Sequence, residues 1–199
     1  MKLISSLIVP VLTFLALGFD FKPGIHGCYI SFKSPTNLTA GAPERLPEAA
    51  RTSRPVSTNG GEVEITRIDG YRVLYNNGKN VPFVNLKVEL SESGSYKADQ
   101  KNLVENLKYL ISNSSGMETK DVIELEFNGL KVYGLSRGSI ESGSTLGIFV
   151  MFPGDDLVVY FYFNNLKPEY RNFESLEDYK RQRDKFMEEY TKHLKSCKE

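Results

Sequence analysis

After the N-terminus, the most apolar part of the chain is the segment 146–163, in which two apolar stretches flank a Pro-Gly-Asp-Asp sequence. This pattern predicts a hairpin with a four-residue loop. With Phe152 opposite Leu157, Val150 would lie opposite Val159, and both faces of the two strands would be apolar. A sheet that faces water alternates apolar and polar residues, so this hairpin is expected at the centre of a sheet that is covered on both faces.

A second hairpin is predicted at 122–135, because Asn128-Gly129 is the strongest two-residue turn signal. This turn sets a register in which Phe127 lies opposite Leu130. In the same register, Glu126 lies opposite Lys131 as a cross-strand charge pair.

Strands are also predicted before these two hairpins. Apolar residues at every second position in 84–90 predict a half-buried strand. The segment 62–75 contains two short strand patterns around Asp69-Gly70, which we interpret as a turn.

Two helices are predicted to cover the sheet. From Asp99, the expected N-cap, to Ile111, the apolar residues follow helical spacing. The second helix starts at Ser175 with a capping-box variant that has Asp178 in place of Glu. Its apolar stripe consists of Leu176, Tyr179, Phe186, Met187, Tyr190 and Leu194. Its opposite face is interpreted as solvated, with an ion pair between Glu188 and Lys192, and carries Arg181, Lys185, Glu188, Glu189 and Lys192.

The N-terminus is typical of an export signal, with Lys2 before an apolar run that ends at Phe19. Residues 1–18 are expected to form a signal peptide cleaved after Gly18. The alternatives are an uncleaved anchor or a lipid anchor on Cys28. Residues 19–61 are expected to be a linker or tether rich in Pro, Ser and Thr, and 62–199 an α+β domain. The stretch 28–33 either returns as an edge strand or belongs to the tether.

The chain has two cysteines, Cys28 and Cys197, near opposite ends of the exported part. In an oxidising compartment a disulfide between them is the simplest arrangement. Two free thiols are the alternative, since the sequence gives no Cα separation.

The predicted order is two strands, a helix, two consecutive hairpins and a closing helix. It describes an α+β fold with a mostly antiparallel sheet between two covering helices. The part from Glu62 to Cys197 resembles the PsbP-like α/β/α sandwich in the helix at Asp99, the turns at Asn128-Gly129 and Pro153-Gly154, and the closing helix start at Phe173-Glu174-Ser175. The resemblance implies a non-catalytic accessory or binding protein, and it carries over no functional residues.

Charge and ligand chemistry exclude several classes. Acidic and basic residues balance at 25 each, so a nucleic-acid partner is not expected. The two histidines, His26 and His193, are far apart in sequence and have no metal-site spacing. We expect no metal and no cofactor, and we interpret His193 as a cation at a helix C-terminus.

One motif suggests catalysis. Gly134-Leu135-Ser136-Arg137-Gly138 fits the G-x-S-x-G pattern of serine hydrolases, with His193 and either Asp178 or Asp155 completing a triad. In those enzymes the serine follows a parallel strand and precedes a helix. Here the strand leaves a hairpin and enters a Gly/Ser-rich loop, so an inactive strand end is preferred.

A second candidate site is aromatic. Tyr133, Tyr160 and Tyr162 are expected on one face of the sheet, where they could form a ligand platform with Arg137 at its edge. The alternative, which we favour, is that a helix covers these rings.

The sequence therefore predicts an exported, non-catalytic binding or accessory domain, with a serine hydrolase using Ser136 as the alternative. The expected partner is a protein or small ligand in the cell envelope, the periplasm or the extracellular space. Contact with a membrane is expected only through an N-terminal anchor.

Overall fold

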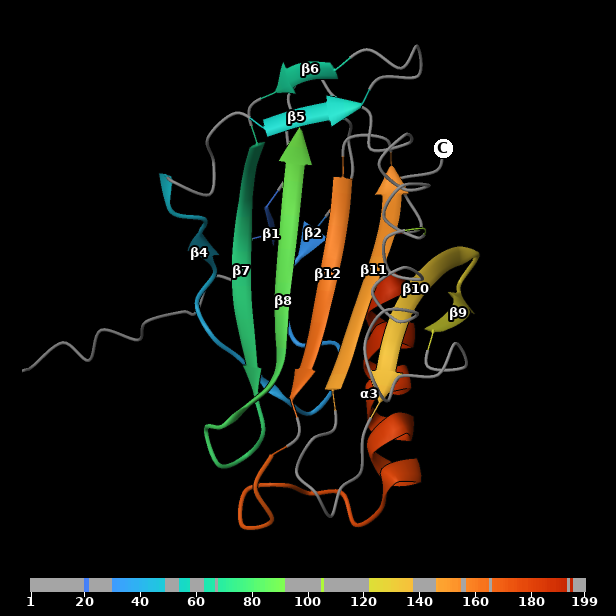
Figure 1. Cartoon of the computed structure of the whole chain (residues 1–199). Helices are drawn as coiled ribbons and strands as arrows, with labels where there is room; N and C mark the ends of the chain where they lie inside the picture. Colours follow the sequence, from blue (N-terminus) through green and yellow to red (C-terminus); the bar gives the residue numbers. More distant parts are fainter. Residues whose placement is uncertain are drawn as a thin grey trace, which may run out of the picture.

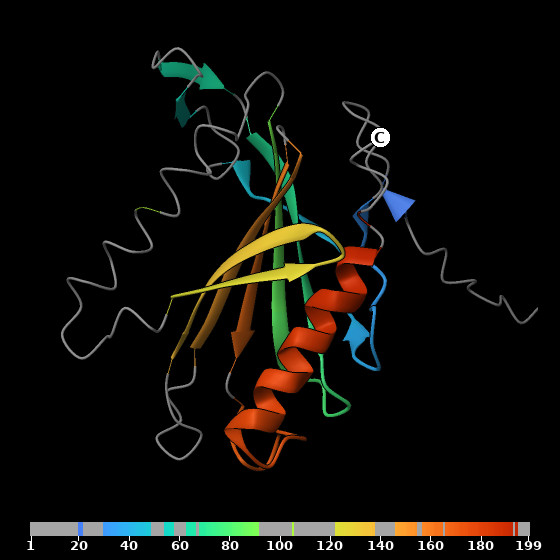
Figure 2. The same ribbon diagram turned by 90° about the vertical axis from the view of Figure 1, so that its right-hand side faces the viewer.

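The antiparallel strands of the computed structural model pair into one large sheet, and a single described helix, α3 (Leu176–Lys192), lies across one of its faces (Figures 1 and 2). The structure describes residues 20–21, 30–48, 54–57, 63–66, 68–91, 105, 122–137, 146–154, 157–164, 166–192 and 194.

The main sheet has the order β3-β7-β8-β12-β11-β10-β9, and β4 also pairs with β7. Its strands are β3 (Thr39–Ala40), β4 (Glu44–Arg45), β7 (Ile68–Asn76), β8 (Pro82–Ser91), β9 (Val122–Phe127), β10 (Leu130–Arg137), β11 (Leu146–Gly154) and β12 (Leu157–Asn164). Two small antiparallel pairs lie outside it, β1 (Asp20–Phe21) with β2 (Ile30–Ser31) and β5 (Arg54–Ser57) with β6 (Val63–Thr66).

The hairpin β9–β10 confirms the register predicted from Asn128-Gly129, with Phe127 opposite Leu130. Asn128 and Gly129 have φ of 52° and 77°, the positive values that a type I′ turn needs at both positions. The charge pair differs from the prediction. Lys131 Nζ lies 2.8 Å from Oε1 of Glu124, the diagonal neighbour, rather than bonding Glu126 directly opposite.

The hairpin β11–β12 lies between β8 and β10, as its apolar faces predicted, but its expected register is wrong. Val159 lies opposite Met151 instead of Val150, and the residue opposite Leu157 is Gly154. The strand β11 continues through Pro153, and a bulge between Met151 and Gly154 shifts the register. Proline donates no ladder hydrogen bond and is therefore tolerated at a bulge.

The shifted register changes which residues of β11 face α3. Phe149 and Met151 now share the α3 side of the sheet with Phe161, and all three are completely buried. Rings from the strands and from α3 pack mainly edge to face, for example Phe161 on Tyr190 with centroids 5.4 Å apart. The predicted apolar stripe of α3 is confirmed, since Tyr179, Phe186, Met187, Tyr190 and Leu194 are buried and Leu176 packs against the core.

The opposite face of the central hairpin has a smaller apolar cluster. Val150 and Val158 are buried there, with Phe152 and Tyr160 packed against them. Both faces of the hairpin are therefore apolar, as the sequence pattern indicated, and α3 covers one of them.

The architecture agrees with the expected α+β class at a coarse level. The structure shows a mostly antiparallel sheet with one C-terminal helix, and two covering helices are not seen among its described residues. The helix expected from Asp99 to Ile111 lies outside them, apart from residue 105.

Part of the stretch expected to be a linker belongs to the sheet and its core. Strands β3 and β4 both pair with β7. Ile30, Phe32 and Leu46 are buried, the first two within the main core. The segment from β3 to β4 is therefore an edge of the main sheet. Strands of two residues are too short to show the alternation by which a strand is recognised in a sequence.

The expected signal peptide, residues 1–18, and the two cysteines, Cys28 and Cys197, lie outside the described residues, so export and the disulfide stay predictions. Within the part of the chain that the structure describes, no helix is both long and apolar enough to cross a membrane.

Candidate functional site

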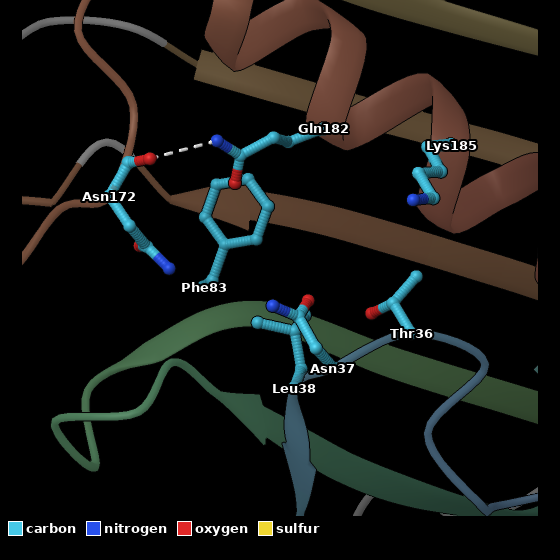
Figure 3. Close-up of a pocket in the computed structure, with 7 residues that line it drawn as sticks. All are labelled: Thr36, Asn37, Leu38, Phe83, Asn172, Gln182 and Lys185. Atoms are coloured by element: carbon cyan, nitrogen blue, oxygen red, sulfur yellow. Dashed lines mark hydrogen bonds between the residues drawn. The ribbon is translucent and has the colours of Figure 1, made fainter.

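A polar pocket of about 310 Å³ opens between α3, the loop before it and the segment 36–38 (Figure 3). Its volume lies at the lower end of the range of small-molecule sites. The lining residues are Thr36, Asn37, Leu38, Phe83, Asn172, Gln182 and Lys185.

The start of α3 fixes two of the lining side chains. Ser175 is the N-cap, and its Oγ accepts a hydrogen bond from the backbone N of Asp178 at 3.1 Å. Asp178 Oδ2 in turn accepts from the backbone N of Glu174 at 3.2 Å, which confirms the predicted capping variant with a shifted return bond. Gln182 and Lys185 follow at a spacing of three residues, so they project from the same face of the helix.

The amide of Gln182 is held in one orientation. Its Nε2 donates to the backbone O of Asn172 at 3.0 Å and to Asp178 Oδ2 at 3.3 Å. The two amide hydrogens are thereby used, and Oε1 is left as an acceptor on the pocket side, above the ring of Phe83 (Figure 3).

The opposite wall comes from the segment 36–38, between the buried Phe32 and the edge strand β3. The pairing of Thr39 with Asn76 holds this segment against the sheet. The Oγ1 atom of Thr36 is buried and has no hydrogen-bond partner among the described residues. Buried hydroxyls nearly always have a partner. Because Oγ1 has no hydrogen bond to a described residue to lose, a rotation of the Thr36 side chain could turn it toward a molecule bound in the pocket.

The floor of the pocket is rigid and aromatic. Phe83 is only 4% exposed, and its ring centroid lies 5.8 Å from those of Phe163 and Tyr179 and 6.0 Å from that of Phe173. Tyr179 donates its hydroxyl to the backbone O of Phe163 at 3.3 Å. Burial raises the pKa of this hydroxyl, with Arg183 acting in the opposite direction, so Tyr179 stays neutral near neutral pH.

Among the described lining residues, the one charged side chain is Lys185, which is exposed and extends toward the segment 36–38 (Figure 3). Within the described part of the chain, no carboxylate forms an ion pair with it. Asp178, which contacts Gln182, is paired with Arg181 and does not line the pocket. The pocket therefore has a positive charge that its own walls do not neutralise.

The tyrosines predicted as a platform do share one face of the sheet. Tyr160 and Tyr162 stack with centroids 6.3 Å apart. Tyr133 lies opposite Val150, which lies opposite Tyr160, so the two rings are two strands apart. The helix α3 packs on the other face of the sheet, and the helix expected at 99–111 lies outside the described residues, so a helical cover over these rings stays a prediction. All three rings are half-buried. The side chain of Arg137 lies outside the described residues.

Only part of the hydrolase alternative lies within the described structure. The backbone of Ser136 lies in β10, in an antiparallel ladder opposite Gly147, rather than at a strand-to-helix turn. Asp178 is engaged at the start of α3. His193, Asp155 and the side chain of Ser136 lie outside the described residues.

No metal centre is found in the part of the chain that is described, where no three His, Cys, Asp or Glu side chains are grouped suitably. His26 lies outside that part, as does His193. Comparison of the chain with protein-family models, with curated proteins and with solved structures finds no match.

Proposed function

We propose that the chain is an exported, non-catalytic domain that binds a small ligand in the polar pocket. The observation that carries the proposal is the pocket itself, in which an edge segment, a loop and α3 bring polar groups together over an aromatic floor. Binding sites of this kind combine apolar walls with a few placed polar groups.

The chemistry of the lining favours binding over catalysis. Three of its seven residues, Asn37, Asn172 and Gln182, are amides, which neither give up nor accept a proton near neutral pH. Its remaining polar groups are Thr36 and Lys185. A nucleophile needs an adjacent base that is itself oriented by a third group, and the lining residues that the structure describes include no carboxylate or imidazole for these roles.

The export part of the proposal rests on Lys2 and the apolar run up to Phe19. The resemblance to PsbP-like domains, many of which bind partners without catalysis, supports the same interpretation by analogy. The ligand or protein partner would then be met in the cell envelope, the periplasm or the extracellular space.

The proposal is tested by screening the full chain against a library of small polar metabolites with ligand-observed NMR. Asn172→Trp should abolish the specific signals, because Asn172 is exposed at the pocket and the larger ring would fill it. Glu169→Trp, an exposed position in the same loop that does not line the pocket, is the matched control and should bind as the parent does. Finding no library member whose binding depends on Asn172 would overturn the proposal.

The hydrolase alternative has its own test. The purified chain is treated with a serine-directed fluorophosphonate and assayed with a short-chain ester. Labelling and turnover that disappear in Ser136→Ala would replace the binding proposal. We expect neither, because a serine inside an antiparallel ladder lacks the helix N-terminus that helps to stabilise an oxyanion.

A further inference from the structure

The charge of the pocket limits the ligands that suit it. Lys185 is the charged group of the lining, and no carboxylate of the described residues pairs with it. A ligand with one negative charge would complete the ion pair, whereas a cationic ligand would be repelled. The neighbouring acid, Asp178, forms an ion pair with Arg181 and accepts hydrogen bonds from Gln182 and from the backbone N of Glu174.

The polar atoms of the lining favour hydroxyl groups. The fixed amide of Gln182 presents an acceptor, and the hydroxyl of Thr36, once turned into the pocket, can both donate and accept. Asn37 and Asn172 add amides at the exposed edge. A hydroxyl also donates and accepts, so a polyhydroxylated ligand can satisfy these groups together.

The pocket is a poorer match for a phosphate. Phosphate sites in proteins usually combine several donors, such as a helix N-terminus or backbone N–H groups with arginine or lysine side chains. The lining contains no arginine, and Gln182 and Lys185 lie beyond the first turn of α3, whose start is capped by Ser175. One exposed lysine balances a carboxylate better than a phosphate dianion.

We infer that the ligand is a small hydroxylated carboxylate of the sugar-acid class, with its carboxylate at Lys185 and its hydroxyls on Gln182 and Thr36. This inference rests on the proposed function, since it names the ligand class of the same pocket. The ring of Phe83 forms the floor beneath the ligand, where it contacts carbon atoms.

The test measures affinities of the full chain for three probes, D-glucuronic acid, D-glucose and D-glucose 6-phosphate, by titration calorimetry or NMR. We expect glucuronic acid to bind about fivefold more tightly than glucose at low ionic strength, which is the upper end of the range for an exposed ion pair. Added salt should narrow this difference, because salt screens an exposed charge.

Two variants separate charge from hydroxyl recognition. Lys185→Met should bind glucuronic acid and glucose equally, while Lys192→Met, on the same helix but outside the pocket, should retain the fivefold preference. Thr36→Val should weaken both sugars to a similar degree. It should leave the fold intact, because its hydroxyl has no protein partner among the described residues to lose.

The outcomes distinguish the inference from the proposed function. Equal binding of glucose, tighter binding of the phosphate, or a preference that survives in Lys185→Met would overturn the inference. So would failure of all three probes. In each case, library compounds whose binding depends on Asn172 would leave the proposed function standing, and their absence would remove both.

Discussion

The two hairpins β9–β10 and β11–β12 have similar lengths and differ in what determines their register. In β9–β10 the residues Asn128 and Gly129 adopt the positive φ values that only a few residue types accept. In β11–β12 a proline-containing bulge shifts the pairing. The comparison shows that turn chemistry specifies register when one face is polar. Two apolar faces leave the register to be decided by packing, because a one-residue shift exchanges one apolar face for the other.

The largest expected effect comes from two matched substitutions in β11. Phe149→Ala removes a completely buried ring from the α3 side and should lower the free energy of unfolding by about 3–5 kcal/mol. Phe152→Ala removes a half-buried ring from the other face and should cost about 1–2 kcal/mol. Chemical denaturation measures both. A larger cost for Phe152 would favour the register predicted from the sequence.

A smaller loss of stability is expected from a substitution at the contact between β10 and β11, where the two hairpins pair. A Cβ at Gly134 in β10 would lie 2.0 Å from Cδ1 of Phe149, so Gly134→Ala should destabilise the fold by about 1–3 kcal/mol through overpacking. Gly154→Ala in β11 is the control, because a Cβ there meets nothing within 4 Å. Equal unfolding midpoints for the two variants would contradict this packing.

Substitutions in the turn of β9–β10 should lower the free energy of unfolding by less. Asn128 Nδ2 donates to the backbone O of Glu188 and to Oγ1 of Thr191, both at 2.9 Å, and so ties the turn to the end of α3. Asn128→Ala loses these bonds and the preference for positive φ, at a cost of about 1–2 kcal/mol. Asn128→Gly keeps the turn and should cost about half as much. A lower thermal unfolding midpoint for Asn128→Gly than for Asn128→Ala would contradict this expectation.

The smallest effect on stability is expected for the charge pair of the hairpin β9–β10. Lys131 and Glu124 are more than half exposed, so Lys131→Ala should leave the unfolding midpoint unchanged within error. Lys87→Met should lower the midpoint, because Lys87 is partly buried between Glu89 and the ring of Tyr160, 4.2 Å from its centroid. A lower unfolding midpoint for Lys131→Ala, with an unchanged midpoint for Lys87→Met, would contradict this expectation.

The elements that the sequence predicted well are those with local signals. The strand β8, the hairpin β9–β10 and α3 follow from alternation, an Asn-Gly turn and a capped apolar stripe. The turn predicted at Asp69-Gly70 is wrong, because both residues lie inside β7. Gly70 is needed there for a close backbone approach, since a Cβ would lie 2.1 Å from the backbone O of Val88.

The pocket could not be predicted because its residues share no local pattern. Thr36 comes from a stretch interpreted as linker, Asn172 from an irregular loop, and Lys185 from a helix face interpreted as solvated. They meet only through the packing of α3 and β3 on the sheet. Arg183 was missed for a related reason. It occupies the apolar stripe of α3 and is buried, with its guanidinium carbon 4.7 Å from the centroid of Phe149.

The short strands β3 and β4 also bear on aggregation. They occupy the outer edge of β7 from Gly70 to Asn76, with added backbone bonds from Gly41 N to Leu74 O at 2.8 Å and from Leu46 N to Gly70 O at 2.9 Å. A long free edge would offer unpaired backbone groups to the strands of other chains. Two strands of two residues, separated by Pro43, satisfy those groups and present little edge of their own. The proline-rich stretch therefore protects this edge of the sheet from association with the strands of another molecule.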